Sequence, residues 1–328
     1  MKPGDGPCLG ALRSLFMRGD IPAAIAACNT ALAANPDDVR VLEILGLSLA
    51  RQRSNAEALA VLERAYRLAP EDPQLSYNLG VTLQNTGDTR RAMLRYRDCL
   101  RALPDHADTL WNYGELLRVS DRFDLAARCF ETLLKKDDTR PDIYHRLGVC
   151  LAHLGRDEDA DEAFRKALGG NSSDPALTHW EYAHFLLARG DFGRGWPHYD
   201  FRFDCGEKTS VSCHSYPYPA WRGEPLEGKT LLVHGEQGLG DEIMFCSVVP
   251  ELAAEAKRIV VACQPPLVRL FADSFPACDV LPHRVFKAPA QAEQIAHIDF
   301  AVSMGSLCRY RRERLDPFES SANGYLGA

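Results

Sequence analysis

The chain has 328 residues, of which 46% are hydrophobic and 25% charged, and its formal net charge is −7. These values lie in the range of ordinary globular proteins, and the length suffices for two domains. The negative charge argues against nucleic acid as the main partner. The sequence contains neither an apolar run long enough to span a membrane nor a secretory leader, so we expect a cytoplasmic protein.

The first half of the chain repeats one pattern at a constant interval. Glycine, alanine and proline each return at this interval, with an aspartate where a fourth proline would fall: Gly46, Gly80, Gly114 and Gly148; Ala24, Ala58, Ala92, Ala126 and Ala160; Pro36, Pro70, Pro104 and Asp138. A fixed period of about 34 residues indicates a repeat architecture, in which each unit is one small supersecondary element. An ordinary helical bundle with accidental periodicity is the alternative.

The unit at 39–72 shows the physical basis of the repeat. Its apolar residues follow helical spacing in two successive segments: Leu42, Leu45 and Leu49, then Ala58, Leu62 and Ala65. Small residues at Gly46 and Ala58 should let the two helices cross closely. Pro70 should end the second helix.

The period and the placement of small, aromatic and proline residues resemble the tetratricopeptide repeat. We expect a superhelix over residues 1–203, with five regular units and a sixth that is displaced by one residue: 5–38, 39–72, 73–106, 107–140, 141–174 and 175–203. Stacked units form a continuous core and a concave wall. Such a wall predicts a protein or peptide partner.

Asn78 and Asn112 occupy one position in adjacent repeats. Similar asparagines in the O-linked N-acetylglucosamine transferases line the superhelix and hold peptide backbone, so both are candidate partner-binding residues. The equivalent positions of the flanking repeats hold Ile44 and Arg146, so asparagine does not continue along the superhelix. The sequence therefore favours a solvated helix surface over peptide binding at these two residues.

The eleven cysteines are odd in number and include no Cys-x-x-Cys pair. Several fall within repeat helices, where a free cysteine acts as a small buried hydrophobe: Cys28, Cys99, Cys129 and Cys150. The ten histidines lack metal-ligand spacing. We expect neither a metal nor a resident cofactor.

The repeats end in an aromatic-rich stretch at 195–202, which we expect to pack against a following domain. Residues 204–228 are rich in Ser, Pro, Gly and Tyr and predict a linker. After it, strands are predicted at 230–234, 258–263, 278–281 and 298–302, with helices at 241–256 and from Pro265 onward. This alternation predicts a Rossmann-like parallel sheet over 229–328.

The loop after the first predicted strand carries glycines at 235, 238 and 240, which would let a ligand approach the backbone. The spacing is not that of a dinucleotide-binding loop, and no phosphate-binding Gly-Lys-Ser/Thr follows. Asp241 and Glu242 would repel a phosphate at the next helix N-terminus. A carboxylate there can act as a general base or, as the residues alone favour, as a helix cap.

Residues 221–233, 235–245 and 264–271 resemble the start of the glycosyltransferase-like domain of bacterial tetratricopeptide proteins. Gly240-Asp241 matches the Gly-Asp of the related lipopolysaccharide heptosyltransferases. The resemblance implies the first lobe of a GT-B fold, with Asp241 as the base that deprotonates an acceptor hydroxyl. It also places Gln237, Gly238 and Gly240 at the substrate or donor site, with a nucleotide sugar as donor and no metal.

In such enzymes a second lobe supplies most of the donor contacts. This chain ends near the end of the first lobe, so we expect it to be incomplete and inactive by itself. Two functions stay open: a glycosyltransferase whose repeats dock the acceptor, and a non-catalytic scaffold that binds protein through the repeats. Nucleotide-dependent oxidoreduction is a distant third. A last feature is an arginine cluster that predicts a solvated helix face rather than an anion site: Arg309, Arg311, Arg312 and Arg314.

Overall fold

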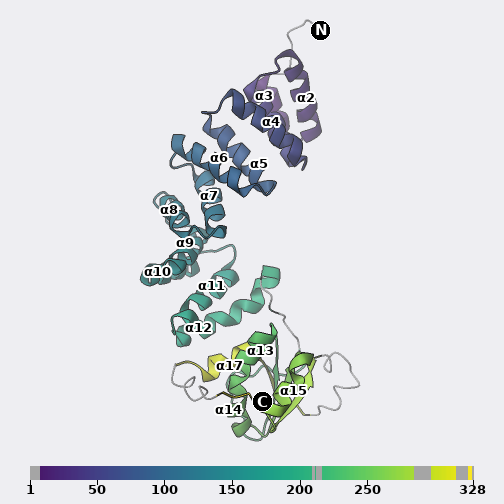
Figure 1. The fold of residues 1–328 in the computed structure, drawn as a ribbon, viewed down its shortest axis with the longest axis vertical. Coiled ribbons are helices and arrows are strands. Elements are labelled where there is room, and N and C mark those ends of the chain that lie inside the picture. The colour runs from purple at the N-terminus through teal and green to yellow at the C-terminus, as the bar shows by residue number, and fades with distance from the viewer. Residues whose placement is uncertain (1–7, 209–210, 212–215, 284–296, 315–323, 327–328) are drawn as a thin grey trace. The chain divides into compact units, whose positions relative to one another are not determined.

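The computed structural model describes residues 8–208, 211, 216–283, 297–314 and 324–326. It divides into two compact units, Met1–Gly170 and Asn171–Ala328, each described by itself (Figure 1). The predicted start of the first repeat at residues 5–7 and the stretch at 315–323 lie outside the described residues.

Within its described residues the first unit is built of antiparallel helix pairs in succession. The helices are α1 (Leu9–Met17), α2 (Ile21–Ala34), α3 (Val39–Arg51), α4 (Asn55–Leu68), α5 (Pro73–Asn85), α6 (Thr89–Ala102), α7 (Ala107–Val119), α8 (Phe123–Leu134), α9 (Pro141–His153) and α10 (Asp157–Gly169). Each predicted repeat up to residue 170 thus holds two helices. We call α3, α5, α7 and α9 the first helices of their repeats.

The helix pairs approach closely where the sequence places glycine. Each repeat glycine faces a large side chain on the second helix of its own repeat: Gly46 and Leu62, Gly80 and Tyr96, Gly114 and Phe130, Gly148 and Phe164. A Cβ atom at Gly80 would lie only 2.6 Å from Cε1 of Tyr96. The predicted close crossing of the two helices is therefore confirmed.

The turn between the two helices of a pair uses a left-handed residue, again at the interval of the repeat. The residues with positive φ are Gly19, Arg53, Gly87, Asp121 and Gly155, followed by Gly190 after a step of one extra residue. Glycine adopts this conformation without steric cost, whereas Arg53 does not. The displaced sixth repeat predicted from the sequence appears in this shift.

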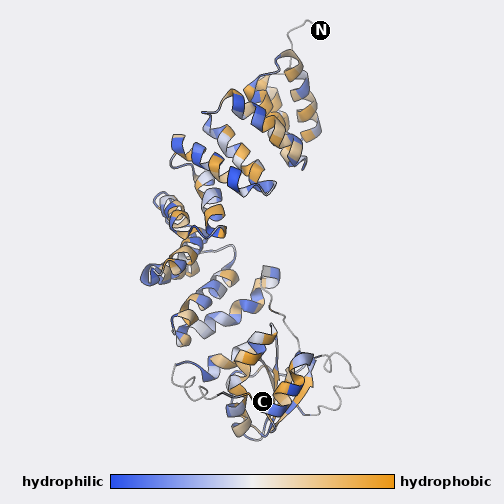
Figure 2. Cartoon of the chain, in the orientation of Figure 1, coloured by the Kyte–Doolittle hydropathy of each residue, from blue (hydrophilic) through white to orange (hydrophobic). Residues whose placement is uncertain are grey.

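Aspartates begin several of these helices by capping free backbone amides. The carboxylate of Asp38 accepts hydrogen bonds from the backbone N–H groups of Arg40 and Val41, at 3.0 and 3.1 Å. Apolar residues then alternate with polar ones around each helix (Figure 2). The cysteines predicted to be core residues, Cys28 and Cys99 among them, are buried and free.

The second unit begins with two helices, α11 (Pro175–Ala188) and α12 (Phe192–Tyr199), and a 3-10 segment, η1 (Asp200–Lys208). The helices that we expected to complete the repeats thus fall in the same compact unit as the sheet. The reason is their aromatic residues. Trp196 and Tyr199 share a hydrophobic core with Phe245 and with residues of the sheet, so the predicted contact of the aromatic stretch with the following domain is confirmed.

The sheet contains four parallel strands in the order β3-β2-β1-β4: β1 (Thr230–His234), β2 (Arg258–Cys263), β3 (Cys278–Pro282) and β4 (Phe300–Ser303). Leu232 of β1 pairs with Val260 of β2 on one side and with Ala301 of β4 on the other. The predicted alternation is thus confirmed as a small parallel sheet. From β1 the chain continues to β2 and then β3 on one side of β1, and β4 pairs with β1 on its other side. The direction in which strands are added to the sheet therefore reverses at β1.

The helices around the sheet are α13 (Leu239–Phe245), α14 (Val249–Glu255), α15 (Val268–Ser274) and α17 (Met304–Arg311), with short 3-10 turns η2 (Cys246–Val248) and η3 (Pro265–Leu267). The single helix predicted over 241–256 was wrong. It divides at η2 because Pro250 in the first turn of α14 has no N–H to continue the earlier helix.

The predicted linker at 204–228 was also partly wrong. Its described end packs on the sheet: the backbone N–H of Trp221 donates to Ala301 at 2.9 Å, and Trp221 and Leu226 are buried. Residues 209–210 and 212–215 of this stretch lie outside the described residues. In the part of the chain that the structure describes, no helix is both long and apolar enough to cross a membrane.

Candidate functional site

Asn78, on α5, is directed into the repeat unit and not toward a partner. Its side chain is buried, and its amide nitrogen donates to Oε1 of Glu43 on α3 at 2.8 Å. Its amide oxygen accepts a hydrogen bond from Nε2 of Gln74 at 3.2 Å. Both halves of the amide are therefore engaged within the unit.

Asn112, on α7, is partly exposed and lies among tyrosines. Burial raises the pKa of Tyr77 and Tyr96, while hydrogen bonding with Asn112 acts in the opposite direction on both phenols. The hydroxyl of Tyr96 also donates to Gln84 at 2.7 Å. Asn112 thus contacts α5 of the preceding repeat, as Asn78 contacts α3.

Polar contacts of this kind join each neighbouring pair of first helices. Between α7 and α9 the partners are Glu115 and Arg146, 3.3 Å apart. We call the participating side chains the first-helix row: Glu43, Tyr77, Asn78, Asn112, Glu115 and Arg146. Among the described residues of this unit, all buried polar side chains belong to these four helices: Glu43, Ser48, Ser76, Asn78, Thr82, Thr109 and His145.

In the second unit, Asp241 acts as a helix cap. Its Oδ2 accepts a hydrogen bond from the backbone N–H of Gly238 at 3.0 Å, at the start of α13. Gln237 is tied to the core: its Nε2 donates to the hydroxyl of Tyr199 at 3.0 Å, and its backbone oxygen accepts from Gln264 at 2.7 Å. Asp241 stays partly exposed, and among the described residues the hydrogen bond of the cap involves only one of its two carboxylate oxygens.

The glycines of the loop make room for internal carboxylates. A Cβ atom at Gly235 would lie 2.0 Å from Oε1 of Glu242, whereas at Gly240 nothing lies within 4 Å. Gly305, which the sequence did not single out, accommodates Glu236 in the same way, because a Cβ atom there would lie 2.3 Å from Oε1 of Glu236. The close approach predicted for a ligand is thus made at Gly235 by the protein itself.

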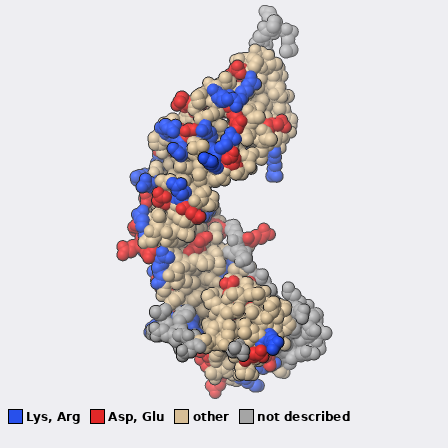
Figure 3. Space-filling view, viewed as in Figure 1, with Lys and Arg blue, Asp and Glu red and all other residues tan. Residues whose placement is uncertain are grey.

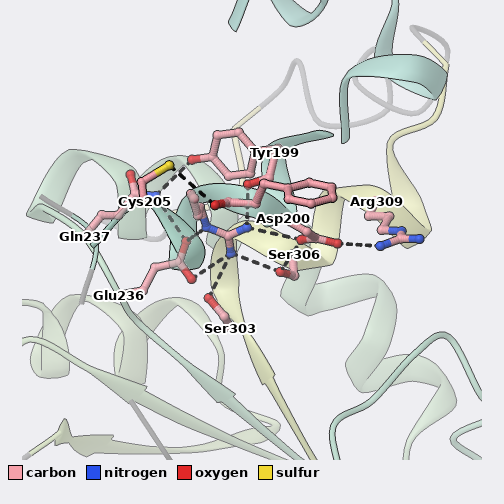
Figure 4. A network of polar contacts seen from close by, with 10 residues as sticks. Tyr199, Asp200, Cys205, Glu236, Gln237, Ser303, Ser306 and Arg309 are labelled. Carbon is pink, nitrogen blue, oxygen red and sulfur yellow. Dashed lines mark hydrogen bonds and ion pairs between the residues drawn. The ribbon is translucent and has the colours of Figure 1, made fainter. Parts of the chain in front are cut away.

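Glu236 and Arg202 form the centre of a buried polar network. Figure 4 shows Glu236 with Asp200, Ser303 and Ser306 around this centre. The guanidinium donates to both carboxylate oxygens, from Nε at 2.7 Å and from Nη2 at 2.8 Å, and the two side chains are 0% and 1% exposed. Arg202 also donates to Asp200 at 3.1 Å and to Ser306 at 3.0 Å. The network joins η1 to the end of β1 and to the first turn of α17.

Glu242, on α13, is a second buried carboxylate beside this loop. Its Oε2 accepts a hydrogen bond from the backbone N–H of Gln264, after β2, at 2.9 Å. Its Oε1 lies 3.1 Å from Nε2 of His283. The carboxylate therefore joins α13 to the residues that follow β2 and β3.

A cavity of about 580 Å³ lies at the carboxyl ends of β1 and β4. Its lining includes Asp200, Phe203, Trp221, His234, Ser303 and Arg309. The strand order reverses between these two strands, which is where open parallel sheets bind their ligands. The loop residues predicted for substrate binding, Gln237, Gly238 and Gly240, do not belong to this lining, and neither does Asp241, the predicted base.

The arginine cluster near the end of the chain is only partly a solvated face: Arg314 is exposed, but the other three arginines form ion pairs. Arg312 is fully buried, and its Nη1 donates to Glu251 of α14 at 2.9 Å. Arg309 pairs with Asp200 at 2.6 Å, and Arg311 pairs with Glu255 at 2.6 Å. The prediction is therefore only partly right, because the acidic partners of these three arginines lie on segments remote in the sequence.

Comparison with known proteins supports the repeats. Residues 9–73 and 116–175 match the tetratricopeptide repeat model. Protein FlbA of Caulobacter vibrioides is 29% identical over 328 residues, covering 96% of this chain and 49% of FlbA. The chain therefore spans about half the length of this relative. The predicted tetratricopeptide repeats are confirmed.

Other relatives cover smaller parts of this chain. The type IV pilus assembly protein PilF of Pseudomonas aeruginosa is 25% identical over 173 residues, covering 51% of this chain and 67% of PilF. The peroxisomal targeting signal receptor of Saccharomyces cerevisiae is 34% identical over 85 residues, covering 26% of this chain and 14% of the receptor. A tetratricopeptide repeat structure from Parabacteroides merdae shares the helical fold with a TM-score of 0.50, at 18% identity, covering 62% of this chain and 80% of that one.

Proposed function

We propose that the chain is a protein-binding scaffold and that its first-helix row holds an extended segment of a partner. The observation that carries this proposal is that a polar contact links each neighbouring pair of first helices: Asn78 with Glu43, Asn112 with Tyr77, and Arg146 with Glu115. Side chains fixed in this way lose little conformational entropy when a partner binds, so they favour recognition.

The row offers groups suited to a peptide backbone. Asn112 is partly exposed and carries both a donor and an acceptor. The side chains of Glu115 and Arg146 are 22% and 27% exposed, and they add one charge of each sign. Asn78 does not contact the partner in this proposal; it positions the side chain of Glu43. Two relatives named above are a targeting-signal receptor and an assembly protein, which agrees with protein binding by such repeats.

Selection from a random-peptide display library on the purified full chain tests the proposal. We expect enriched peptides to protect α5, α7 and α9 from hydrogen exchange. The variants Asn112→Ala and Arg146→Ala should each weaken binding about tenfold, the effect of removing one or two interfacial hydrogen bonds.

Arg165→Ala is the matched control. Arg165 is exposed on α10, which is the second helix of its repeat, so this variant should leave binding unchanged. Peptides that protect only the second unit would contradict the proposal. So would peptides whose affinity both row variants leave unchanged.

Sugar transfer is a second candidate, supported by the cavity at the point where the strand order of the parallel sheet reverses. In this proposal the sheet is a Rossmann-like lobe of a GT-B fold. Asp241 is then the base, Gln237, Gly238 and Gly240 contact the substrate, and the donor is a nucleotide sugar. The family match and the relatives named above do not support this activity, so the scaffold is the better supported function.

Calorimetric titration of the full chain with a panel of nucleotide sugars tests the second candidate. Binding of one sugar that Asp241→Asn leaves intact, together with turnover that this variant abolishes, is the expected result. No heat with any donor, or turnover equal in the variant, would contradict it.

A further inference from the structure

We propose that the groove between α4 and α6 docks an acidic segment of a partner protein. This surface lies on second helices of the repeats. The inference extends the scaffold proposal, but it rests on different side chains from those of the first-helix row.

The charge of the two helices is the first argument. Together α4 and α6 carry seven arginines and three acidic residues, in a chain whose net charge is −7. The intervening α5 has no charged residue. Lys and Arg side chains gather over these helices in the space-filling view (Figure 3). A basic surface on an acidic protein favours a negatively charged partner.

A cavity of about 270 Å³ lies within this basic surface. Arg67, Arg91 and Arg95 line it, and Leu79 and Leu94 supply apolar lining. Leu94 is 42% exposed, so its side chain is accessible to a ligand, and Glu63 and Tyr66 complete the lining. The cavity therefore combines positive charge with an apolar contact, as small peptide-binding pockets do.

Two of the arginines are held in fixed positions. The guanidinium of Arg95 lies over the ring of Tyr66, 4.4 Å from its centroid, and pairs with Asp98 at 3.0 Å. Arg91 pairs with Glu63 of α4. Arg67 is exposed, and in the part of the chain that the structure describes it forms no ion pair. Arg67 is thus the arginine that can pair with a ligand carboxylate. Arg91 and Arg95 lie next to it in fixed positions.

These features favour an acidic peptide over nucleic acid. Glu63 and Asp98 stand among the arginines and would repel a continuous phosphate backbone. A peptide can place a carboxylate next to Arg67 and an apolar side chain against Leu94. We infer a segment in which acidic and apolar residues alternate.

The test is fluorescence anisotropy of the full chain with a labelled, end-blocked short peptide that alternates glutamate and leucine. Binding should weaken as salt is added, because exposed charges are screened. The same peptide with glutamine in place of glutamate should bind at least about tenfold more weakly.

Arg67→Glu should also weaken the glutamate peptide about tenfold, with an unchanged melting curve showing that the fold is intact. Arg165→Glu is the matched control and should have no effect, since Arg165 is an exposed arginine on the second helix of another repeat. Asn112→Ala should have no effect either, which separates this surface from the first-helix row.

Four results would overturn the inference. One is an absence of binding to the unaltered chain. Another is an equal loss with Arg165→Glu, because the attraction would then be diffuse. The third is displacement of the peptide by a single-stranded RNA of the same length that binds more tightly. A loss with Asn112→Ala alone would overturn it as well while supporting the first-helix row.

Discussion

The guanidinium of Arg202 and the carboxylate of Glu236 form a bidentate ion pair that is wholly shielded from water. The pair fills the space left open by Gly305, at the N-terminus of α17. That position is the one where a helix attracts an anion. In this protein the anion is supplied by the chain itself.

The first prediction follows from the burial of this pair. Glu236→Gln should lower the free energy of unfolding of the second unit by about 3 kcal/mol, because it removes the bidentate partner of a buried guanidinium and leaves only Asp200 as its counter-charge. The double variant Arg202→Met, Glu236→Leu should recover most of that loss. Urea unfolding monitored by tryptophan fluorescence measures both, since Trp180, Trp196 and Trp221 all belong to this unit.

The exposed pair of Arg258 and Asp279 provides a control in the same unit, with side chains 37% and 51% exposed. Arg258→Gln should cost at most about 1 kcal/mol. If Glu236→Gln were as mild as this control, the buried pair would not hold the unit together.

The second prediction concerns the close crossing of the repeat helices. Gly80→Ala should destabilise the repeat unit by about 1 to 3 kcal/mol, because its methyl group would overlap the ring of Tyr96. Gly169→Ala is the matched change, since Gly169 is a helical glycine with no atom within 4 Å of a Cβ position. It should be neutral or stabilising by up to about 1 kcal/mol. Thermal unfolding followed by far-ultraviolet circular dichroism should separate the two, and equal melting temperatures would refute the packing argument.

The third prediction uses the left-handed turn of the repeats. Arg53 has a φ of 66°, at a position where three of the other repeats of this unit have glycine. Arg53→Gly should raise the stability of the repeat unit by about 1 kcal/mol, because it removes steric strain. The reverse change, Gly87→Arg, should lower it by a similar amount. Chemical unfolding of both variants measures the pair of effects, and shifts of the same sign would be evidence against backbone strain.

The fold of the first unit could be predicted from the sequence because the residues that determine it are close together in the chain and recur in each repeat. Gly46 and Leu62 lie within one repeat, and Gly80 and Tyr96 stand at the same two positions of the next. The turn positions follow the same period. A pattern repeated several times is hard to produce by chance, and each copy predicts the same contact.

In the second unit, the sequence predicts the strands but not the contacts between the charged side chains. Strands are short apolar runs, which the sequence shows directly. The partners of its charged residues are not local: Arg202 pairs with Glu236, and Arg312 pairs with Glu251 from 61 positions away. Glycine at 235 suggested a ligand because the sequence cannot tell an external anion from the carboxylate of Glu242. In the first-helix row, likewise, only the structure shows that Asn78 faces Glu43.

The two histidines His179 and His198 lead to the last prediction. Their Nδ1 atoms are 2.6 Å apart, and His179 stacks on Phe201 with ring centroids 3.8 Å apart. Burial, together with the nearby charges of His179 and Arg194, lowers the pKa of His198 to about 4. Burial also lowers the pKa of His179. Two imidazoles in such contact cannot both be protonated without strong repulsion.

The packing of α11 against α12 should therefore weaken in acid. A histidine with an ordinary pKa of 6.5 in the unfolded chain takes up its proton there first, so stability is full above about pH 6.5 and declines as the pH falls toward 4. Hydrogen exchange of α11 and α12 at pH 7 and pH 5, corrected for the intrinsic pH dependence of exchange, measures the decline. His198→Gln removes one of the two groups and should flatten it. A decline as steep in His198→Gln as in the unaltered chain would show that other groups set the acid sensitivity of this helix pair.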